Sequence, residues 1–381
     1  MHGLGLTNLI EHFRNFVGIQ NSHTIAARDY HQPLLRTGYE YIVPHRVGKL
    51  FCYAAKDSGR VIHKTDKVFT LEYKSGKKVT IPIGRQHGLA EGTCYPHEIV
   101  SDLNVGDTFK PDDILTYNTN FFERDWLDPK RIILKTNALV TTALTLNNEV
   151  YEDSSALSHK LSSKLSTKIT KIKSFTVEFT KNVIKMLPVG STVEPDSVLF
   201  TILDETSDLT NLSEDTIKLL STMANLSPKA KLQGVIDKYE IYYNGSTTDM
   251  SPTLKKLAKE LDAQVKADSK HTDLEVDSNA VDSEYRVEGN NLQLDTMEIR
   301  VYITIEAGMG VGDKVVFAAQ LKSVVGDIMQ YDIHTEDNKE VMAMFGFKSI
   351  SNRIVLSPYI TGTTNTLLKE VSKQVAAEYF S

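Results

Sequence analysis

Residues 298–325 read EIRVYITIEAGMGVGDKVVFAAQLKSVV, and this stretch sets the expected architecture of the chain. β-Branched and aromatic residues dominate 298–305, which predicts a strand. The glycine-rich stretch 308–312 lacks the strand-to-helix context of a dinucleotide loop, so it predicts a tight turn. Lys314 and Lys322 follow this turn and flank a run of seven mostly apolar residues. The stretch therefore predicts a strand that leads through a turn to a pair of lysines.

The overall composition is that of a globular chain without a membrane span. Its 381 residues allow two or three domains, and 41% of them are hydrophobic. No apolar run approaches the roughly 18 residues of a transmembrane helix, and the N-terminus does not resemble a signal peptide. The net charge of −6 argues against a free-standing nucleic-acid binder, but it allows a subunit whose lysines line one cleft. Cys52 and Cys94 alone form neither a disulfide framework nor a zinc site, which favours a reducing compartment.

Periodicity and turn residues predict many short strands and few long helices. The expected elements are a helix over 1–20, a β-hairpin over 67–82 that turns at Ser75-Gly76, a strand over 132–146, a helix over 154–165, a strand over 232–243, a helix that begins at Ser251-Pro252, and a C-terminal helix over 365–380. This pattern predicts a mixed, β-rich α+β fold with barrel-like modules.

Several short motifs occur along the chain in an order that resembles one family, the second-largest (β) subunit of multisubunit DNA-directed RNA polymerases. In that family a strand also leads through a Gly-Asp-Lys turn to a second lysine, with seven residues between the two lysines. The other matching blocks are RNFVGIQN at 14–21, PL at 33–34, TGYE at 37–40, DSG at 57–59, GTC at 92–94, VGD at 105–107, DIL at 113–115, NALV at 137–140, YEDS at 151–154, VGSTV at 189–193, SVLF at 197–200 and RIVLSP at 353–358.

The resemblance implies a double-psi β-barrel catalytic module that is interrupted by a flap-like module. We expect a fork or connector segment over 1–45, the first part of the hybrid-binding barrel domain over 46–169, the flap-like insertion over 170–295, and the second part of the barrel with the C-terminal helix over 296–381. The resemblance covers only the C-terminal half of a β subunit. A chain that starts at Met1 here resembles the split β subunits of giant bacteriophages.

The resemblance also implies a site for phosphate groups in RNA synthesis. Lys314 and Lys322 would hold phosphates at the RNA 3′ end, and Arg14 would contact the incoming triphosphate or order the fork region. Glu152 and Asp153 would lie near the second Mg²⁺ through water. Simpler explanations remain open for each: solvated surface lysines, an exposed helix arginine, and an acid pair that interacts with the dipole of a helix starting at Ser154.

Three departures from the family pattern affect the expected site. The stretch 315–321 is apolar where the family has a loop rich in Gly, Arg, His and Asn, and Ser323 replaces a usual glycine. The family arginine that contacts triphosphate falls near Thr364, so that contact is either absent here or supplied by another residue.

The resemblance implies that this chain works only within a complex. Mg²⁺ would be held mainly by the largest, β′-like subunit, because the chain has no Asp-x-Asp-x-Asp run. The implied partners are an N-terminal β-like fragment, β′-like fragments, template DNA, the RNA transcript and a promoter-specificity factor at the flap, with no membrane. The implied location is the cytoplasm of an infected bacterial host, or the virion.

Two rival functions follow from the same residues. A non-catalytic β-barrel scaffold or assembly protein would keep the fold and bind partners only, and the apolar stretch between the lysines favours it. A stand-alone metal-dependent nuclease would need a carboxylate cluster, which the sequence does not show.

Overall fold

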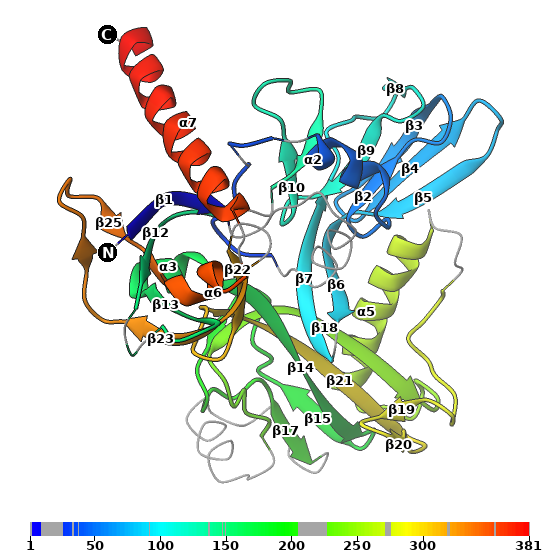
Figure 1. Ribbon diagram of the computed structural model, residues 1–381. Helices are drawn as coiled ribbons and strands as arrows, with labels where there is room; N and C mark the ends of the chain where they lie inside the picture. Colours follow the sequence, from blue (N-terminus) through cyan, green and yellow to red (C-terminus); the bar gives the residue numbers. More distant parts are fainter. Residues whose placement is uncertain are drawn as a thin grey trace. The chain divides into compact units, whose positions relative to one another are not determined.

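A computed structural model gives the fold of the chain (Figure 1). It describes residues 2–8, 26–32, 34–36, 38–90, 92–135, 138–146, 148, 150–204, 227–270, 276–317, 321–353 and 356–380. Strands make up 43% and helices 19%, which confirms a β-rich mixed fold. The chain divides into two compact units: unit 1 contains Met1–Arg60, His97–Lys168 and Ala307–Ser381, and unit 2 contains Val61–Pro96 and Ile169–Glu306.

Unit 1 is built around a six-stranded sheet with the order β1-β12-β26-β13-β23-β22. Two of its five neighbouring pairs, β12 with β26 and β13 with β23, are parallel, and the other three are antiparallel. Strands from three distant parts of the chain therefore meet in one sheet. Their bounds are β1 His2–Asn8, β12 Leu139–Thr145, β13 Ser154–Ser158, β22 Lys314–Phe317, β23 Leu321–Met329 and β26 Ala343–Gly346.

One face of this sheet packs into an apolar core. Leu144, Leu157, Val325 and Phe345 from four different strands are each at most 1% exposed, and Phe317 of β22 packs against Phe345 with ring centroids 4.9 Å apart. Burial of each such side chain contributes about 1.5–3 kcal/mol. The core also takes in residues of the helices α3 (His159–Lys164) and α6 (Phe347–Ser351).

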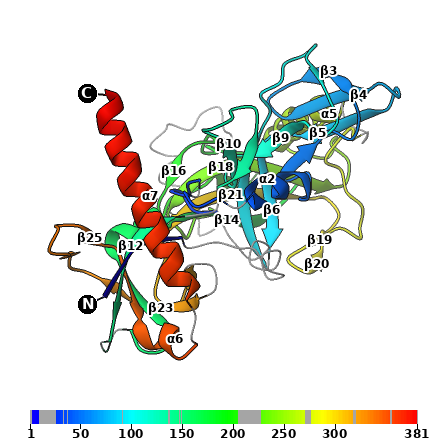
Figure 2. The same ribbon diagram turned by 45° about the horizontal axis from the view of Figure 1, so that its top comes forward.

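The remaining described elements of unit 1 are short strands and helices. They are α2 Tyr39–Ile42, the 3₁₀ helix η1 Val43–His45, β2 Cys52–Ala54, β8 Thr108–Phe109, β9 Ile114–Asn118, β10 Phe122–Arg124, β11 Ile132–Leu134, β24 Ile333–His334, β25 Glu340–Val341 and α7 Ser357–Phe380. The first two turns of α7 are partly buried, whereas residues 367–380 are exposed. Figure 2 shows this C-terminal half of α7 extending beyond the strands of the six-stranded sheet.

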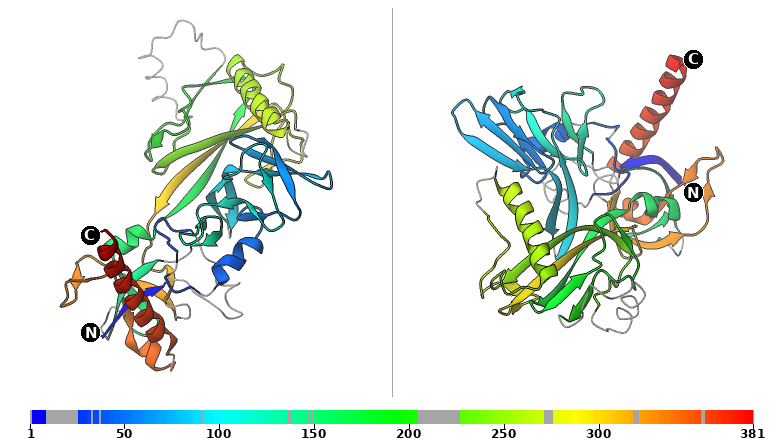
Figure 3. Two further views of the ribbon diagram at one scale, coloured as in Figure 1. Left: turned by 90° about the horizontal axis from the view of Figure 1, so that it is seen from above. Right: turned by 180° about the vertical axis from the view of Figure 1, so that it is seen from behind.

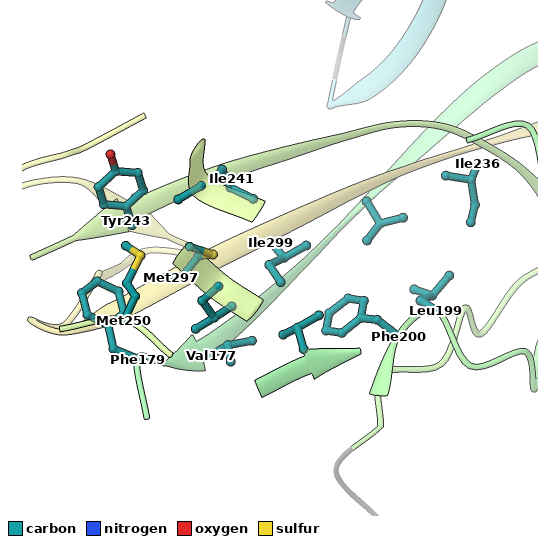
Figure 4. Close-up of a cluster of buried hydrophobic side chains, with 14 of the residues drawn as sticks. Val177, Phe179, Leu199, Phe200, Ile236, Ile241, Tyr243, Met250, Met297 and Ile299 are labelled. Atoms are coloured by element: carbon teal, nitrogen blue, oxygen red, sulfur yellow. The ribbon is translucent and has the colours of Figure 1, made fainter. Parts of the chain in front are cut away.

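Unit 2 contains the long strands β14 (Thr167–Glu178), β18 (Gly234–Asn244) and β21 (Thr296–Ala307). In the sheet order β16-β18-β21-β14-β7, β18 and β21 pair antiparallel along almost their whole length. One face of these strands forms a core in which Phe200, Ile236 and Met297 are fully buried (Figure 4). Helix α5 (Pro252–Ser269) lies beside the long strands (Figure 3).

The other described strands of unit 2 are shorter. They are β3 Gly59–Lys64, β4 Val68–Tyr73, β5 Lys78–Pro82, β6 Gly84–Ala90, β7 Thr93–Val100, β15 Lys181–Ile184, β16 Thr192–Val193, β17 Thr201–Asp204, β19 Arg286–Val287 and β20 Asn290–Asn291, of which β3 and β7 cross the boundary with unit 1 in the chain. Both cysteines of the protein are buried and free.

Four of the expected elements are confirmed. β4 and β5 form the expected hairpin, with Gly76 at a positive φ of 81° in its turn. β18 is the strand expected over 232–243, and α7 includes the expected C-terminal helix. Helix α5 begins where its capping residues predicted, because Ser251 accepts a hydrogen bond from Leu254 N and Pro252 occupies the first turn.

Three other expectations are wrong. Residues 2–8 form a strand rather than a helix, because they pair with β12, and residues 9–20 of the expected helix lie outside the described residues. The stretch 132–146 holds two strands of different sheets, β11 and β12, and residues 136 and 137 lie outside the described residues. The stretch 154–165 is strand β13 followed by the short helix α3, because β13 lies between β26 and β23 and pairs with both.

Candidate functional site

Lys314 and Lys322 lie on the antiparallel hairpin of β22 and β23. Burial alternates along β22 and along 321–326 of β23: Val315, Phe317, Leu321 and Val325 are buried, whereas the two lysines are exposed. The apolar residues between the lysines thus include core residues of the six-stranded sheet. This explains their departure from the polar family loop; residues 318–320 lie outside the described residues.

The strand register places both lysines on the same face. Lys314 pairs with Val324, and Lys322 pairs with Val316, so the lysines occupy diagonal positions. Diagonal side chains of an antiparallel pair lie about 7–8 Å apart. Two long lysine side chains at that separation can both reach one anionic backbone.

Neither lysine has a carboxylate partner among the described residues. Elsewhere in unit 1, Lys160 Nζ lies 2.9 Å from Asp332 Oδ2 and 3.1 Å from Glu340 Oε1. The free ammonium groups on the β22–β23 hairpin repel each other weakly, on the order of 0.5 kcal/mol in water. A bound anion would remove that repulsion.

The glycine-rich turn before Lys314 is fastened at both ends. Gly312, with φ 93°, donates its N–H to Val325 O at 2.8 Å, and Asp313 O accepts from Val325 N at 2.8 Å. At the other end of the turn, Ser162 Oγ donates to Met309 O at 2.6 Å. Glycine is required at 312 because a left-handed backbone is strained for most other residues. The turn therefore fixes the start of β22, whose first residue is Lys314.

Glu152 and Asp153 lie in an exposed turn that precedes β13. Glu152 has a positive φ of 53°. Asp153 O accepts hydrogen bonds from Val324 N at 3.0 Å and from Ser323 Oγ at 2.8 Å. Ser323, which replaces the family glycine, therefore ties the acidic turn to the lysine hairpin. Because Ser154–Ser158 is a strand, the expected interaction of this acid pair with the dipole of a helix starting at Ser154 does not occur.

A second contact with the acidic turn comes from the segment around α6. Arg353 Nη2 lies 2.8 Å from Asp153 Oδ2, and Ser349 Oγ donates to Glu152 O. Gly346 packs so closely that a Cβ atom at this position would lie 2.8 Å from Glu152 O. The backbone of the acidic turn is thus held from two sides.

The hairpin and the acidic turn meet through one row of paired residues. Ser154 of β13 pairs with Val324 of β23, which pairs with Lys314 of β22. Neighbouring strands are about 4.8 Å apart, so the row puts the acidic turn about 10 Å from the backbone of Lys314. Four of the five expected site residues, Lys314, Lys322, Glu152 and Asp153, therefore lie at one edge of the sheet. The fifth, Arg14, lies outside the described residues.

Thr364 is the position near which the resemblance placed a triphosphate-contacting arginine. Thr364 lies half-buried on α7 and carries no charge. Arg353 is the cation that the structure brings to the acidic turn, about half exposed. From the sequence, Arg353 was part of the RIVLSP motif and was not predicted as a site residue, because nothing in the sequence relates it to Asp153.

A second group of charged side chains lies in unit 2, on the polar face of β18 and β21. Here Asp237 accepts from Arg85 Nη2 at 3.2 Å, from Thr304 Oγ1 at 2.5 Å, and contacts His87 Nε2 at 3.4 Å. Burial by itself would raise the pKa of Asp237. The hydrogen bonds from His87, Thr304 and Arg85 outweigh this and hold the pKa well below its ordinary value.

The same polar face contains two more paired carboxylates. Glu240 lies 2.6 Å from Lys238 Nζ and accepts from Tyr302 Oη at 2.7 Å. Glu298, fully buried, accepts from Arg300 Nε at 2.8 Å and from Tyr285 Oη at 2.8 Å. Every acid in this network has a cationic partner, as burial of charge requires.

The described residues contain no group of three or more His, Cys, Asp or Glu side chains placed to hold a metal ion. Glu152 and Asp153 offer two neighbouring carboxylates, and Asp153 is already paired with Arg353. This donor set fits a contact to a metal ion that is held mainly by other ligands. In the described part of the chain, no helix has the length and apolarity needed to cross a membrane.

Comparisons with known proteins assign no family to the chain. None of the family models matches it, and no curated protein matches it significantly. The site is therefore interpreted from its own residues and from the motifs they form.

Proposed function

We propose that this chain is the C-terminal part of a split β-like subunit of a multisubunit DNA-dependent RNA polymerase. In this proposal Lys314 and Lys322 hold phosphates of the growing RNA, and the Glu152–Asp153 turn faces the nucleotide-bound Mg²⁺. The observation that carries the proposal is the pair of exposed lysines, held on one face of a hairpin without carboxylate partners among the described residues.

The chemistry of the lysines supports a sliding contact with nucleic acid. A lysine ammonium group is a compact charge that binds phosphate without reading a base, so it can release the strand after each addition step. The acidic turn is fixed to the same hairpin through Ser323 and Val324. Phosphate and metal contacts would therefore keep a constant spacing during each cycle.

The fold of unit 1 is compatible with the barrel of the proposal. Six strands from three chain segments meet in one sheet, with two parallel pairs among them. We propose that this sheet is the double-psi barrel, with the flap-like module inserted between β13 and β22. Mg²⁺, when bound, would neutralise charge on the transferred phosphates, and its main ligands would come from the β′-like chain.

Reconstitution tests the proposal directly. The chains that co-purify with this protein, including one with an Asp-Phe-Asp-Gly-Asp motif, would be assembled with and without it on an RNA–DNA scaffold, with primer extension as the readout. We expect extension only with this chain present. Lys314→Ala and Lys322→Ala should each slow extension by about 10²-fold or more, the usual loss for an electrostatic contact in a reacting site.

The control is Lys256→Ala, which removes a 78% exposed lysine on α5 and should leave the rate unchanged. Full activity of both site variants would remove the site assignment. Normal extension by both site variants, in a complex that does not assemble without this chain, would establish the scaffold function instead.

A further inference from the structure

The connection between β10 and β11 presents two large apolar side chains to solvent. We name residues 125–131 the Trp126 tip. Within it, Trp126 is 68% exposed and Leu127 is 79% exposed. Trp126 is the only tryptophan of the protein. Single exposed apolar residues are common, but two adjacent ones at this exposure on a structured hairpin need an explanation.

A buried ion pair fixes the conformation of the Trp126 tip. The Asp125 side chain is 1% exposed and lies 2.7 Å from Arg36 Nη1. It also accepts from Leu127 N at 3.0 Å and Tyr41 Oη at 3.2 Å. Burial by itself would raise the pKa of Asp125, yet the hydrogen bonds from Arg36 and Leu127 hold it below its ordinary value. A carboxylate is expensive to bury, so this pair specifies the loop conformation at a cost in desolvation.

A second set of hydrogen bonds braces the same loop. Gln32 Nε2 donates to Arg124 O at 2.7 Å, and Gln32 Oε1 accepts from Arg36 Nη2 at 2.7 Å. Asp125 N donates to Arg131 O at 2.9 Å across the loop. Trp126 and Leu127 are therefore held in place before any partner arrives, which reduces the entropy lost on binding.

The charges around the Trp126 tip favour a protein partner over a nucleic acid. The three arginines in and beside the tip each have a carboxylate: Arg36 has Asp125, Arg124 has Asp102 at 2.8 Å, and Arg131 has Asp128 at 3.1 Å. Lys130 is the remaining cation of residues 125–131. Nucleic-acid affinity comes mainly from cations that are free to neutralise phosphates. Exposed tryptophan with arginine and a paired polar rim is instead the composition of a protein–protein hot spot.

A second copy of this chain does not fit the Trp126 tip. In a symmetric dimer the same patch would face itself, and two projecting tips bury far less than the roughly 800 Å² per partner of a stable interface. A head-to-tail contact between copies would build a ring or a filament, and a cross-link to a second copy would reveal it. A projecting pair of apolar side chains needs a concave receptor on a different surface.

We propose that the Trp126 tip anchors a second, different polypeptide, which receives Trp126 and Leu127 in an apolar pocket whose rim carries little net charge. The inference rests on the proposed function in one respect, because it places that polypeptide among the chains of the same complex. Hot-spot side chains of this kind carry a large share of the affinity of an interface.

Photo-cross-linking identifies what covers the tip. The complex, purified through a tag on this chain, would carry p-benzoyl-phenylalanine in place of Trp126, and a control would carry it in place of Leu294, which is 70% exposed in unit 2. We expect one dominant cross-link from position 126 to apolar residues of one stoichiometric partner chain. A cross-link to a second copy, a nuclease-sensitive cross-link, or none in an assembled complex would overturn the proposal.

The affinity of that partner chain for single variants then gives the contribution of Trp126 and Leu127 to binding. Trp126→Ala should weaken its binding by about 30-fold or more, equivalent to about 2 kcal/mol, and Leu127→Ala should weaken it by a smaller factor. Leu294→Ala should change nothing. All three residues are exposed, so the thermal stability of the isolated chain should not change. Binding of Trp126→Ala within about threefold of wild type would overturn the anchor.

The two proposals can fail separately. Cross-linking and binding do not require RNA synthesis, so an anchor that behaves as expected in a complex without extension activity would leave the inference standing and the proposed function rejected. Full extension activity, together with unchanged partner binding by Trp126→Ala, would support the proposed function and reject the anchor.

Discussion

Two polar surfaces of this protein handle charge in opposite ways. On the polar face of β18 and β21 in unit 2, every acid is matched: Asp237 with Arg85, Glu240 with Lys238, and Glu298 with Arg300. On the β22–β23 hairpin in unit 1, Lys314 and Lys322 share a face, and neither has a carboxylate partner in the described part of the chain.

The difference separates structural charge from charge that is available to a ligand. Buried charges must be paired, because an unpaired one costs several kcal/mol, so the β18–β21 network is explained by burial alone. The exposed lysines need no partner for stability. They differ from ordinary surface lysines because they share one face of a hairpin, next to the hydrogen-bonded Glu152–Asp153 turn. Substitutions on the two surfaces should therefore change different measurements, and we order them by their expected effect on the free energy of unfolding.

The largest loss is expected from Glu298→Ala. This change leaves Arg300 and the Tyr285 hydroxyl without their carboxylate in a site where Glu298 is 0% exposed. The free energy of unfolding, measured with urea, should fall by about 3 kcal/mol, the low end for a broken buried pair because Arg300 is 25% exposed. Glu284→Ala, at an exposed position in the same unit, is the matched control. A loss below about 0.5 kcal/mol would mean that this face is not held by charge pairing.

A smaller loss is expected from Gly346→Ala, which tests the acidic turn of the other surface. The added Cβ would lie 2.8 Å from Glu152 O and 3.3 Å from Val150 O, so the backbone must shift. Overpacking of this kind costs about 2 kcal/mol. Unlike Glu298→Ala, this change should also slow primer extension by the reconstituted complex, because it displaces Glu152 and Asp153. Normal stability together with normal extension would show that the turn tolerates movement.

The Asp237→Asn change should have an effect that depends on pH. Because the folded state lowers the pKa of Asp237, its ionised form stabilises the fold above the unfolded pKa of about 3.9. This stabilisation is lost as the pH falls below that value and through the folded pKa. Wild type should exceed Asp237→Asn by about 1.5 kcal/mol at pH 7, and the gap should shrink as the pH falls from about 4 to 2.5. A gap that stays constant over this range would contradict the role of the ionised carboxylate.

The parts of the fold that could be predicted are those set by local sequence. The β4–β5 hairpin follows from alternation around Ser75-Gly76, and α5 follows from the cap at Ser251. The failures are set by distant partners. Ser154–Ser158 becomes a strand because β23 and β26 pair with it on both sides, and residues 2–8 become a strand through β12. Neither pairing leaves a signal in the local pattern.

The candidate site also has features that local sequence predicts and features that only the fold reveals. Spacing and motif order identified the lysines and the Glu152–Asp153 pair. Their common edge depends on the β22–β23 register and on the parallel pairing of β13 with β23, which the sequence does not contain. The contact of Arg353 with Asp153 joins residues 200 positions apart, so only the folded chain reveals it. The exposure of Trp126 was also unpredictable, because it depends on the buried pair beneath it.

The most direct measurement is a double-mutant cycle on the rate of RNA extension, with Lys314→Ala, Lys322→Ala and both together. Each single change should slow extension by about 10²-fold, and the double change should cost less than the product of the two, because both ammonium groups would hold one phosphate backbone. The free energy of unfolding should change by less than about 0.5 kcal/mol in all three variants. Extension within about twofold of wild type in both single variants would contradict the account.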